Sequence, residues 1–185
     1  MNFYSCCIIL KNGGIEMSKI LVLGNSGSGK STFTSQLAKK LQIDFLHLDT
    51  LIYKHDWKKP EYEEMEKQIE LFLTKENWII DGNFLKKAPS RFYQCDTVYF
   101  LDINRFTCFF SVIFRYFKYK GKHRDSRSDL CDEKITKDYL KWVFLDYYKT
   151  SRKTIIEFLK NNPDKKIFIF KTRQQIKKYL KEVQS

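Results

Sequence analysis

The sequence feature that most constrains the fold is a glycine-rich run, GNSGSGKST, at residues 24–32. It follows the apolar segment 19–23, which is typical of a buried parallel strand. It precedes residues 30–41, whose apolar side chains recur at helical spacing. Glycines let backbone N–H groups turn inward around an anion, and a helix N-terminus adds a favourable dipole. We therefore predict a strand–loop–helix unit that binds phosphate; the alternative is a glycine-rich turn without a nucleotide.

The spacing G-x-x-x-x-G-K-S assigns separate tasks to the side chains of this glycine-rich loop, residues 24–32. Lys30 is predicted to reach the β- and γ-phosphate oxygens of ATP, and Ser31 is predicted to bind Mg²⁺. ATP and Mg²⁺ are therefore the predicted cofactors. The residues predicted to contact the nucleotide are Gly24, Gly27, Ser28, Gly29, Lys30, Ser31 and Thr32.

Strand-like and helix-like runs alternate along the rest of the chain. Short apolar runs predict further strands at 45–48, 78–80, 97–101 and 166–170. Helical spacing predicts helices at 61–73, 105–120 and 173–183, with one or two more within 133–159. This alternation predicts the α/β class, with a parallel sheet that carries helices on both faces.

Three predicted strands end in an acidic residue, at Asp49, Asp81 and Asp102. The carboxyl ends of parallel strands line the ligand crevice of an open sheet, so these carboxylates can hold a metal, orient water or accept a proton. The alternative is that an aspartate only caps a helix or forms a turn. That alternative suits Asp102 best and Asp49 least.

A second set of residues that suggests a function consists of arginines and a charged segment. Residues 118–132, KYKGKHRDSRSDLCD, have the composition of a mobile surface flap. Arg115, Arg124, Arg127 and Arg152 flank or occupy this segment. Guanidinium groups neutralise the charge on a transferring phosphoryl group, and a closing flap excludes water. The alternative is surface salt bridging with neighbouring acidic residues.

Several aromatic and imidazole side chains have structural interpretations. We expect one set of aromatic residues at helical spacing to pack in the core or beneath the flap rather than stack on a nucleobase. These residues are Phe109, Phe110, Phe114, Tyr116 and Phe117. His47 ends a buried strand and is expected to be a structural imidazole. Trp57 lies in a turn that can line an acceptor pocket.

Composition limits the environment and the partners. The 185 residues carry a formal net charge of +12, which favours polyanionic partners, although lysines also simply solvate a surface. The five cysteines show no C-x-x-C pair, so no disulfide framework or zinc site is predicted, and a reducing, cytoplasmic location fits best. No export signal is apparent. The apolar run 106–117 is too short and too polar to span a bilayer, so no membrane partner is expected.

The first sixteen residues fit no element of the predicted fold. We expect residues 1–16 to be a disordered or non-native extension, with natural translation starting at Met17. The predicted domain then spans residues 17–185, with a small basic lid at about 116–132.

An ordered set of motifs gives the chain a family resemblance. After the glycine-rich loop come HLD at 47–49, WIIDGNF at 78–84, FLDINR at 100–105 and the basic flap. This set resembles the adenylate kinase-like P-loop kinases, and most closely a bacterial subgroup labelled "DNA topology modulation protein". The resemblance covers residues 19 to about 183. It implies a three-layer P-loop NTPase fold whose five-stranded parallel sheet has the order 2-3-1-4-5.

The resemblance also implies roles for individual residues. The residues implied in catalysis are Lys30, Asp49, Arg115, Arg124 and Arg152. Those implied in acceptor binding are Asp49, Trp57, Asp81 and Arg91, where Arg91 corresponds to an acceptor-phosphate arginine. Those implied in metal binding are Ser31 and Asp81.

The chain departs from the family pattern at four places. Asn83-Phe84 replaces the F-P-R that follows the DG turn in adenylate kinases, and residues 50–56 contain no arginine. Ser111 and Ser126 stand where the subgroup usually has an arginine and a proline. These departures argue against AMP as the acceptor.

Two functional hypotheses follow. The first is a phosphotransferase that passes the γ-phosphoryl group of ATP to a small acceptor: a nucleoside, a nucleotide or a hydroxylated metabolite. Asp49 then orients an acceptor hydroxyl, whereas Arg91 matters more if the acceptor is already a phosphate. The second is a nucleic-acid-associated, ATP-binding regulator of DNA topology, which the net charge favours and the lack of a DNA-binding motif disfavours.

Overall fold

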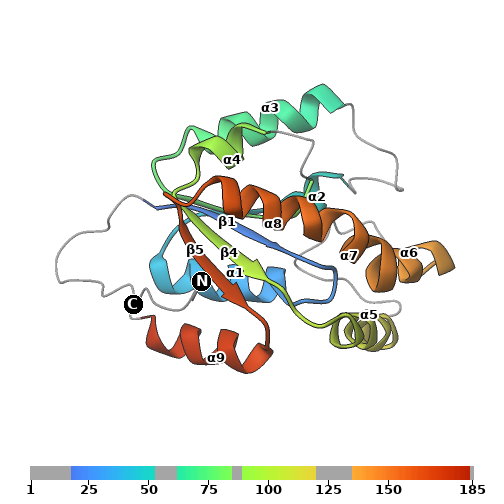
Figure 1. Cartoon of the computed structure of the whole chain (residues 1–185). Helices are drawn as coiled ribbons and strands as arrows, with labels where there is room; N and C mark the ends of the chain where they lie inside the picture. Colours follow the sequence, from blue (N-terminus) through green and yellow to red (C-terminus); the bar gives the residue numbers. More distant parts are fainter. Residues whose placement is uncertain (1–17, 53–61, 85–88, 120–134, 184–185) are drawn as a thin grey trace.

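A computed structural model of the chain describes residues 18–52, 62–84, 89–119 and 135–183. They contain one sheet of five parallel strands in the order β2-β3-β1-β4-β5 (Figure 1). The strands are β1 (Lys19–Gly24), β2 (Phe45–His47), β3 (Trp78–Asp81), β4 (Thr97–Leu101) and β5 (Lys166–Phe170). The predicted fold class, strand positions and strand order are confirmed.

Helices connect the strands and extend beyond the predicted set. The helices are α1 (Lys30–Leu41), α2 (Leu48–Ile52), α3 (Tyr62–Leu73), α4 (Ser90–Gln94), α5 (Arg105–Tyr119), α6 (Lys137–Lys141), η1 (Trp142–Asp146), α7 (Tyr147–Lys149), α8 (Ser151–Asn161) and α9 (Arg173–Glu182). The sequence did not reveal α2 and α4, because a helix of about one turn is too short to show a period. The helical region 133–159 breaks at Thr150, whose backbone is not helical.

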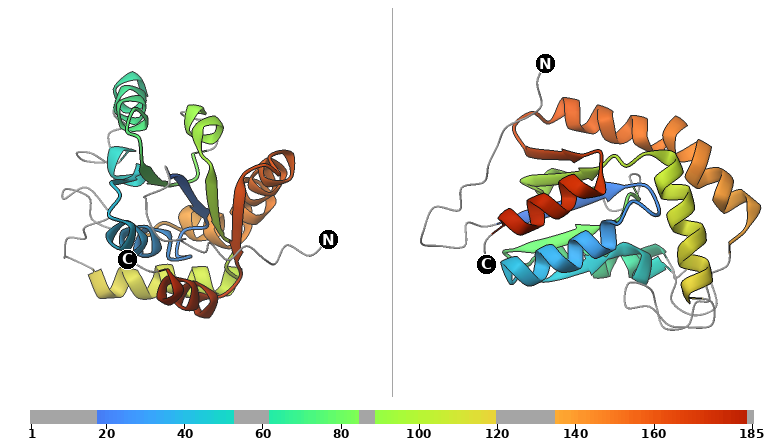
Figure 2. Two further views of the ribbon diagram at one scale, coloured as in Figure 1. Left: turned by 90° about the vertical axis from the view of Figure 1, so that its left-hand side faces the viewer. Right: turned by 90° about the horizontal axis from the view of Figure 1, so that it is seen from below.

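Two hydrophobic clusters cover the two faces of the sheet. Helices α3, α4 and α8 lie on one face, and α1 and α9 lie on the other (Figures 1 and 2). Successive strand residues point to opposite faces. Leu21 and Leu23 of β1 therefore join the first cluster, while Ile20 and Val22 join the second. This burial on both faces explains why β1 reads as a continuous apolar run.

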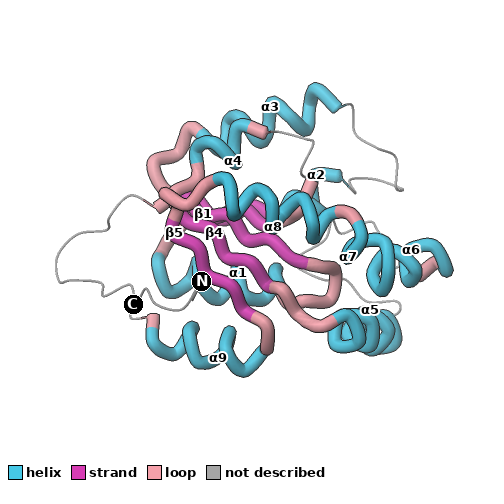
Figure 3. The backbone as a smooth tube through the Cα atoms, in the orientation of Figure 1, coloured by secondary structure: helices cyan, strands magenta, loops and turns pink. Residues whose placement is uncertain are grey.

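The carboxyl end of the sheet is covered differently. Helix α5 runs across the ends of the strands, and α6, η1 and α7 lie beside it (Figures 2 and 3). Segment η1 is a π-helix, in which the Tyr147 N–H reaches back five residues to the Trp142 carbonyl. Single π-helical turns inside helices often occur at functional sites. Helices thus cover the carboxyl end of the sheet, which is the end where the sequence places the three acidic residues.

Several predicted features fall outside the described residues. They include the extension 1–16, Trp57, Arg124, Arg127 and most of the predicted lid, of which residues 116–119 continue α5. No helix within the described ranges is long and apolar enough to cross a membrane.

Candidate active site

The glycine-rich loop joins β1 to α1 and curls around its own backbone. Gly27 and Gly29 have φ angles of 78° and 99°, in the region that favours glycine. A Cβ on Gly27 would lie 2.3 Å from the Cys108 carbonyl oxygen, so the loop can approach α5 this closely only with glycine here. Lys30 folds back and donates from Nζ to the Asn25 carbonyl, 3.0 Å away. The loop is therefore closed and held against α5.

A cavity of about 660 Å³ opens over this loop. Its walls come from the loop itself, from α2, from α5 and from the first residue of α9. The described residues that line it are Ser26, Gly27, Gly29, Lys30, Ser31, Thr32, Asp49, Thr107, Phe110, Ser111, Phe114, Arg115, Lys118 and Arg173. The cavity is thus lined by five of the residues predicted to contact the nucleotide, Gly27 and residues 29–32.

The other two predicted nucleotide contacts, Gly24 and Ser28, are buried beneath the loop surface. Asn83 brackets Gly24 with its side-chain amide. Its Oδ1 accepts from the Gly24 N–H at 3.0 Å, and its Nδ2 donates to the Gly24 carbonyl at 2.8 Å. The first residue of the glycine-rich loop is therefore fixed to the turn that follows β3.

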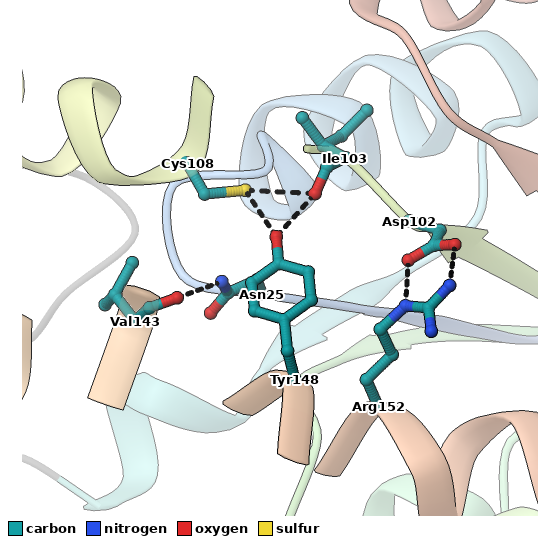
Figure 4. A network of polar contacts seen from close by, with 7 residues as sticks. All are labelled: Asn25, Asp102, Ile103, Cys108, Val143, Tyr148 and Arg152. Carbon is teal, nitrogen blue, oxygen red and sulfur yellow. Dashed lines mark hydrogen bonds and ion pairs between the residues drawn. The ribbon is translucent and has the colours of Figure 1, made fainter. Parts of the chain in front are cut away.

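A second support for the loop comes from α6 and η1. The Asn25 Nδ2 donates to the Val143 carbonyl at 2.7 Å, and the Ser26 Oγ lies 2.6 Å from the Tyr139 hydroxyl (Figure 4 shows the first contact). Tyr139 and Val143 are four residues apart, so they lie on one helix face. This face holds two consecutive residues of the loop.

Arg115 is brought to the same place. Its Nη2 donates to the Tyr139 hydroxyl at 3.4 Å, and its side chain lines the cavity. A single hydroxyl therefore contacts both Ser26 of the loop and Arg115 of α5. A guanidinium held here is well placed to stabilise negative charge above the loop.

Asp49 lies in the first turn of α2, directly after β2, and its side chain lines the cavity. It is the one carboxylate among the described residues that line it. Asp49 thus shares a cavity with Lys30 and Ser31, as the strand-end argument predicts.

Asp81 and His47 form a buried pair at the ends of two neighbouring strands. They are register partners at the ends of β3 and β2, and both are almost fully buried. The His47 Nδ1 lies 2.9 Å from the Asp81 Oδ2, an ion-pair distance without the alignment of a hydrogen bond. His47 is thus buried as expected. Asp81 is not among the residues that line the cavity, so its role as a metal ligand stays a prediction.

Arg91 is fully buried beneath the turn that follows β3. Its Nη1 donates to the Gly82 carbonyl at 3.0 Å, and its Nη2 donates to the carbonyls of Asn83 and Phe84 at 2.6 and 3.1 Å. Burial lowers the pKa of Arg91 to about 9, so it remains charged at neutral pH. Arg91 therefore organises the backbone around Asn83.

Arg152 and Asp102 form an ion pair with each other, away from the residues that line the cavity. The Arg152 Nε and Nη2 each lie 2.7 Å from an oxygen of Asp102 (Figure 4). This bidentate contact raises the pKa of Arg152. Neither residue is among those that line the cavity, so the predicted catalytic role of Arg152 stays a prediction.

Arg173 is a site residue that the sequence reasoning missed. Its Nη2 donates to the Gly27 carbonyl at 3.0 Å and to the Ser111 Oγ at 2.5 Å. It begins α9, three residues beyond the end of β5. The rule that strand ends line the crevice, applied to β5 as it was to β2, would have found it.

One structural expectation is wrong in part. Phe110, Phe114 and Phe117 were expected to pack in the core or beneath the flap; they do not pack in the core, because 63–72% of their surface is exposed, and most of the flap lies outside the described residues. Phe110 and Phe114 line the same cavity as the glycine-rich loop. Helical spacing showed that these residues share a face of α5, but it did not show whether another element covers that face.

No group of three or more metal-binding carboxylate, imidazole or thiol side chains occurs in the described part of the chain. Ser31 therefore stands without a protein cluster around it. Mg²⁺ commonly keeps several waters and takes oxygens from nucleotide phosphates, so a single hydroxyl fits such a site.

Solved structures share this fold. A shikimate kinase from Acinetobacter baumannii, in complex with shikimate, matches with a TM-score of 0.56 and 19% identity, over 89% of this chain and 92% of that chain. A deoxyadenosine kinase from M. mycoides with bound dATP matches with a TM-score of 0.52 and 16% identity, over 88% and 95%. No family model and no curated protein matches the chain. At these identities the likeness shows a shared fold, a five-stranded parallel sheet flanked by helices.

Proposed function

We propose that this protein is an ATP-dependent phosphotransferase that passes the γ-phosphoryl group to a small acceptor. One observation carries the proposal: Lys30, Ser31, Arg115 and Asp49 line a single cavity. Cations and loop N–H groups stabilise the charge of a transferring phosphoryl group, and a carboxylate orients the group that attacks it. The shared fold of two structurally similar kinases agrees with this proposal.

Residues of the loop and of α5 would handle the donor. Lys30 would exchange its bond to the Asn25 carbonyl for the β- and γ-phosphate oxygens. Arg173, which bonds to Gly27 of the loop, and Arg115, which bonds to Tyr139 beside it, would add positive charge. The exposed rings of Phe110 and Phe114 offer an apolar surface for the base. Ser31 would hold Mg²⁺, which neutralises charge on the phosphates when bound.

The test is phosphoryl transfer from γ-labelled ATP in the presence of Mg²⁺ and a panel of nucleosides, nucleotides and sugars. We expect a labelled product with at least one acceptor. The Lys30→Met variant should lose transfer, because it removes the cation at the loop. Lys40→Met should retain it, because Lys40 sits at the far end of α1 and bonds to Val183. Equal ADP formation with and without every acceptor would instead indicate an ATPase.

A second candidate is a nucleic-acid-associated protein. Two features favour it: the net charge of +12 and the exposed aromatic rings of α5, which are Phe106, Phe110, Phe114 and Phe117. The nucleobases of a single strand can stack on aromatic side chains, and positive charge attracts its phosphates. Binding of a labelled single-stranded oligonucleotide at increasing salt tests it. A phosphate-tracking site loses affinity by orders of magnitude between low and physiological salt, and an absence of binding at low salt removes this candidate.

A further inference from the structure

We infer that the group phosphorylated at this site is an alcohol hydroxyl rather than a phosphate. The inference rests on the proposed phosphotransferase function and narrows the class of acceptor. Three features of the described residues carry it: the backbone contacts of Arg91, the position of Asp49 in the cavity, and the contacts that link the cavity arginines to the glycine-rich loop, directly for Arg173 and through Tyr139 for Arg115.

Arg91 is the residue that the family resemblance implies for an acceptor phosphate, and both of its terminal nitrogens already bond to the backbone. Nη1 and Nη2 bond to three consecutive backbone carbonyls, of Gly82, Asn83 and Phe84. The guanidinium carbon lies 4.5 Å from the centre of the Phe92 ring, and the side chain has no exposed surface. A phosphate could reach Arg91 only by breaking the turn that holds Asn83 to the glycine-rich loop.

Asp49 sets the charge on the acceptor side. Its carboxylate lines the cavity together with Lys30 and Ser31. A phosphate monoester carries about −1.5 to −2 charges near neutral pH and offers acceptor oxygens, so a carboxylate beside it is repulsive. An alcohol donates a hydrogen bond to the same carboxylate. Asp49 therefore favours an alcohol over a phosphate at this wall.

The two arginines of the cavity are held at the donor side. Arg115 contacts Tyr139, whose hydroxyl also pairs with Ser26 of the loop. Arg173 donates directly to the Gly27 carbonyl. Arg173 thus lies against the loop whose N–H groups would surround the phosphates of ATP, and Arg115 is linked to the same loop through the Tyr139 hydroxyl. Their charge offsets that of the donor during transfer.

The reaction balances with ATP and the alcohol alone. A lone pair of the alcohol oxygen forms a bond to the γ-phosphorus, and the bond from the γ-phosphorus to the β,γ-bridging oxygen breaks. The alcohol proton passes to the Asp49 carboxylate and then to solvent. The products are a phosphate monoester, ADP and a proton. A phosphate acceptor would need no such base, because its oxygen is already ionised.

The principal experiment uses the wild-type protein and a filtered extract of small cellular metabolites. One half of the extract is treated with alkaline phosphatase, which converts phosphate monoesters into alcohols, and the phosphatase is then removed. Each half is incubated with the protein, Mg²⁺ and γ-labelled ATP, and labelled products are separated. We expect transfer into the treated half to equal or exceed transfer into the untreated half.

The outcomes separate the inference from the proposal beneath it. Loss of transfer after phosphatase treatment would overturn the alcohol inference while leaving a phosphotransferase. No transfer into either half would overturn the proposed function itself. Neither outcome depends on whether a variant folds.

Two variants then connect the acceptor to the named residues. Asp49→Asn should lower kcat by at least about a hundredfold, in the range of a lost general base, with little change in ATP binding. Asp44→Asn, at an exposed surface carboxylate, is the matched control and should leave kcat unchanged. Arg91→Lys should lower the melting temperature without raising the acceptor KM. A raised acceptor KM at unchanged melting temperature would contradict the inference.

Discussion

Asn83 makes the most specific single-residue contact with the glycine-rich loop. Its amide satisfies both backbone groups of Gly24, and Arg91 fixes the Asn83 carbonyl from below. A phosphate-binding loop works only when its N–H groups converge, so the first residue of the loop must be held in place. On the proposed function, Asn83 would therefore be a positioning residue for the loop, supported by Arg91.

Replacing Asn83 by aspartate tests this role. The variant keeps an acceptor for the Gly24 N–H but loses the donor to the Gly24 carbonyl. We expect the free energy of unfolding to fall by about 1–3 kcal/mol, because a part-buried carbonyl loses its partner and faces a charge. We expect the Kd for ATP to rise about tenfold. Urea denaturation and calorimetric titration measure the two effects.

The matched control is Asn162→Asp. It removes a comparable hydrogen bond, which the Asn162 side-chain amide donates over 2.8 Å to the Phe158 carbonyl at the end of α8. This variant should lose stability and keep its ATP affinity. A normal ATP affinity in Asn83→Asp would show that the bond to Gly24 does not position the loop.

The two described cysteines give a prediction about reactivity. Burial raises the pKa of Cys95 and Cys108 from 9.0 to about 11. Below both values this lowers the thiolate fraction by about a hundredfold, and thiolate is the reactive form. In the native protein at about pH 8, iodoacetamide should leave both unmodified, and in denaturant both should react. Mass spectrometry of the peptides measures this, and rapid native alkylation of either thiol would contradict it.

At this scale the sequence singled out Lys30, Ser31 and Asp49, and the structure brings the three to one cavity, while their roles stay predictions. A motif fixes the first two, and the end of a strand fixes the third. It did not predict the contacts of Asn83 or Arg173, because their partners lie 59 and 146 residues away along the chain. It also did not predict that Arg91 is buried, because a lone arginine carries no signal of its burial.

At the scale of elements, the segment formed by α6 and η1 acts as a brace for the glycine-rich loop. Its residues Tyr139 and Val143 contact Ser26 and Asn25. The predicted helical region 133–159 was correct in outline, but apolar spacing cannot distinguish an α-helix from a π-helical turn. Nor could it show which face of α5 stays exposed. Such properties depend on packing against distant elements.

Tyr139→Phe tests the brace with the loss of one oxygen atom. The hydroxyl joins Ser26 to Arg115, so its removal should misplace the guanidinium more than it disturbs the loop. We expect kcat to fall about tenfold, equivalent to about 1.4 kcal/mol, with a smaller change in the KM for ATP. Steady-state kinetics with the identified acceptor measure both constants.

Tyr179→Phe is the control for this prediction. It removes a hydroxyl that lies 2.6 Å from the Tyr99 hydroxyl, within the core between β4 and α9. It should lower stability and leave kcat unchanged. If Tyr139→Phe and Tyr179→Phe have the same kinetics as the wild type, the brace has no role in placing Arg115.

At the scale of the whole molecule, the strand order brings the parts of the site together. The glycine-rich loop follows the central strand β1, Asp49 follows the edge strand β2, and Arg173 follows the opposite edge strand β5. Helix α5 crosses the strand ends and adds Arg115 (Figure 2). The alternation of strands and helices predicted the parallel sheet, and the family resemblance predicted its order.

The central claim is that the glycine-rich loop binds ATP through Lys30, and calorimetric titration with Mg²⁺ and ATP tests it most directly. Lys30→Ala removes the hydrogen bond from the Lys30 Nζ to the Asn25 carbonyl, and we expect the variant to remain folded without this bond. We expect the wild type to bind, Lys40→Ala to bind equally well, and Lys30→Ala to bind about ten- to a hundredfold more weakly, as for a lost charged hydrogen bond. Equal binding by Lys30→Ala, or no binding by the wild type, would contradict the account.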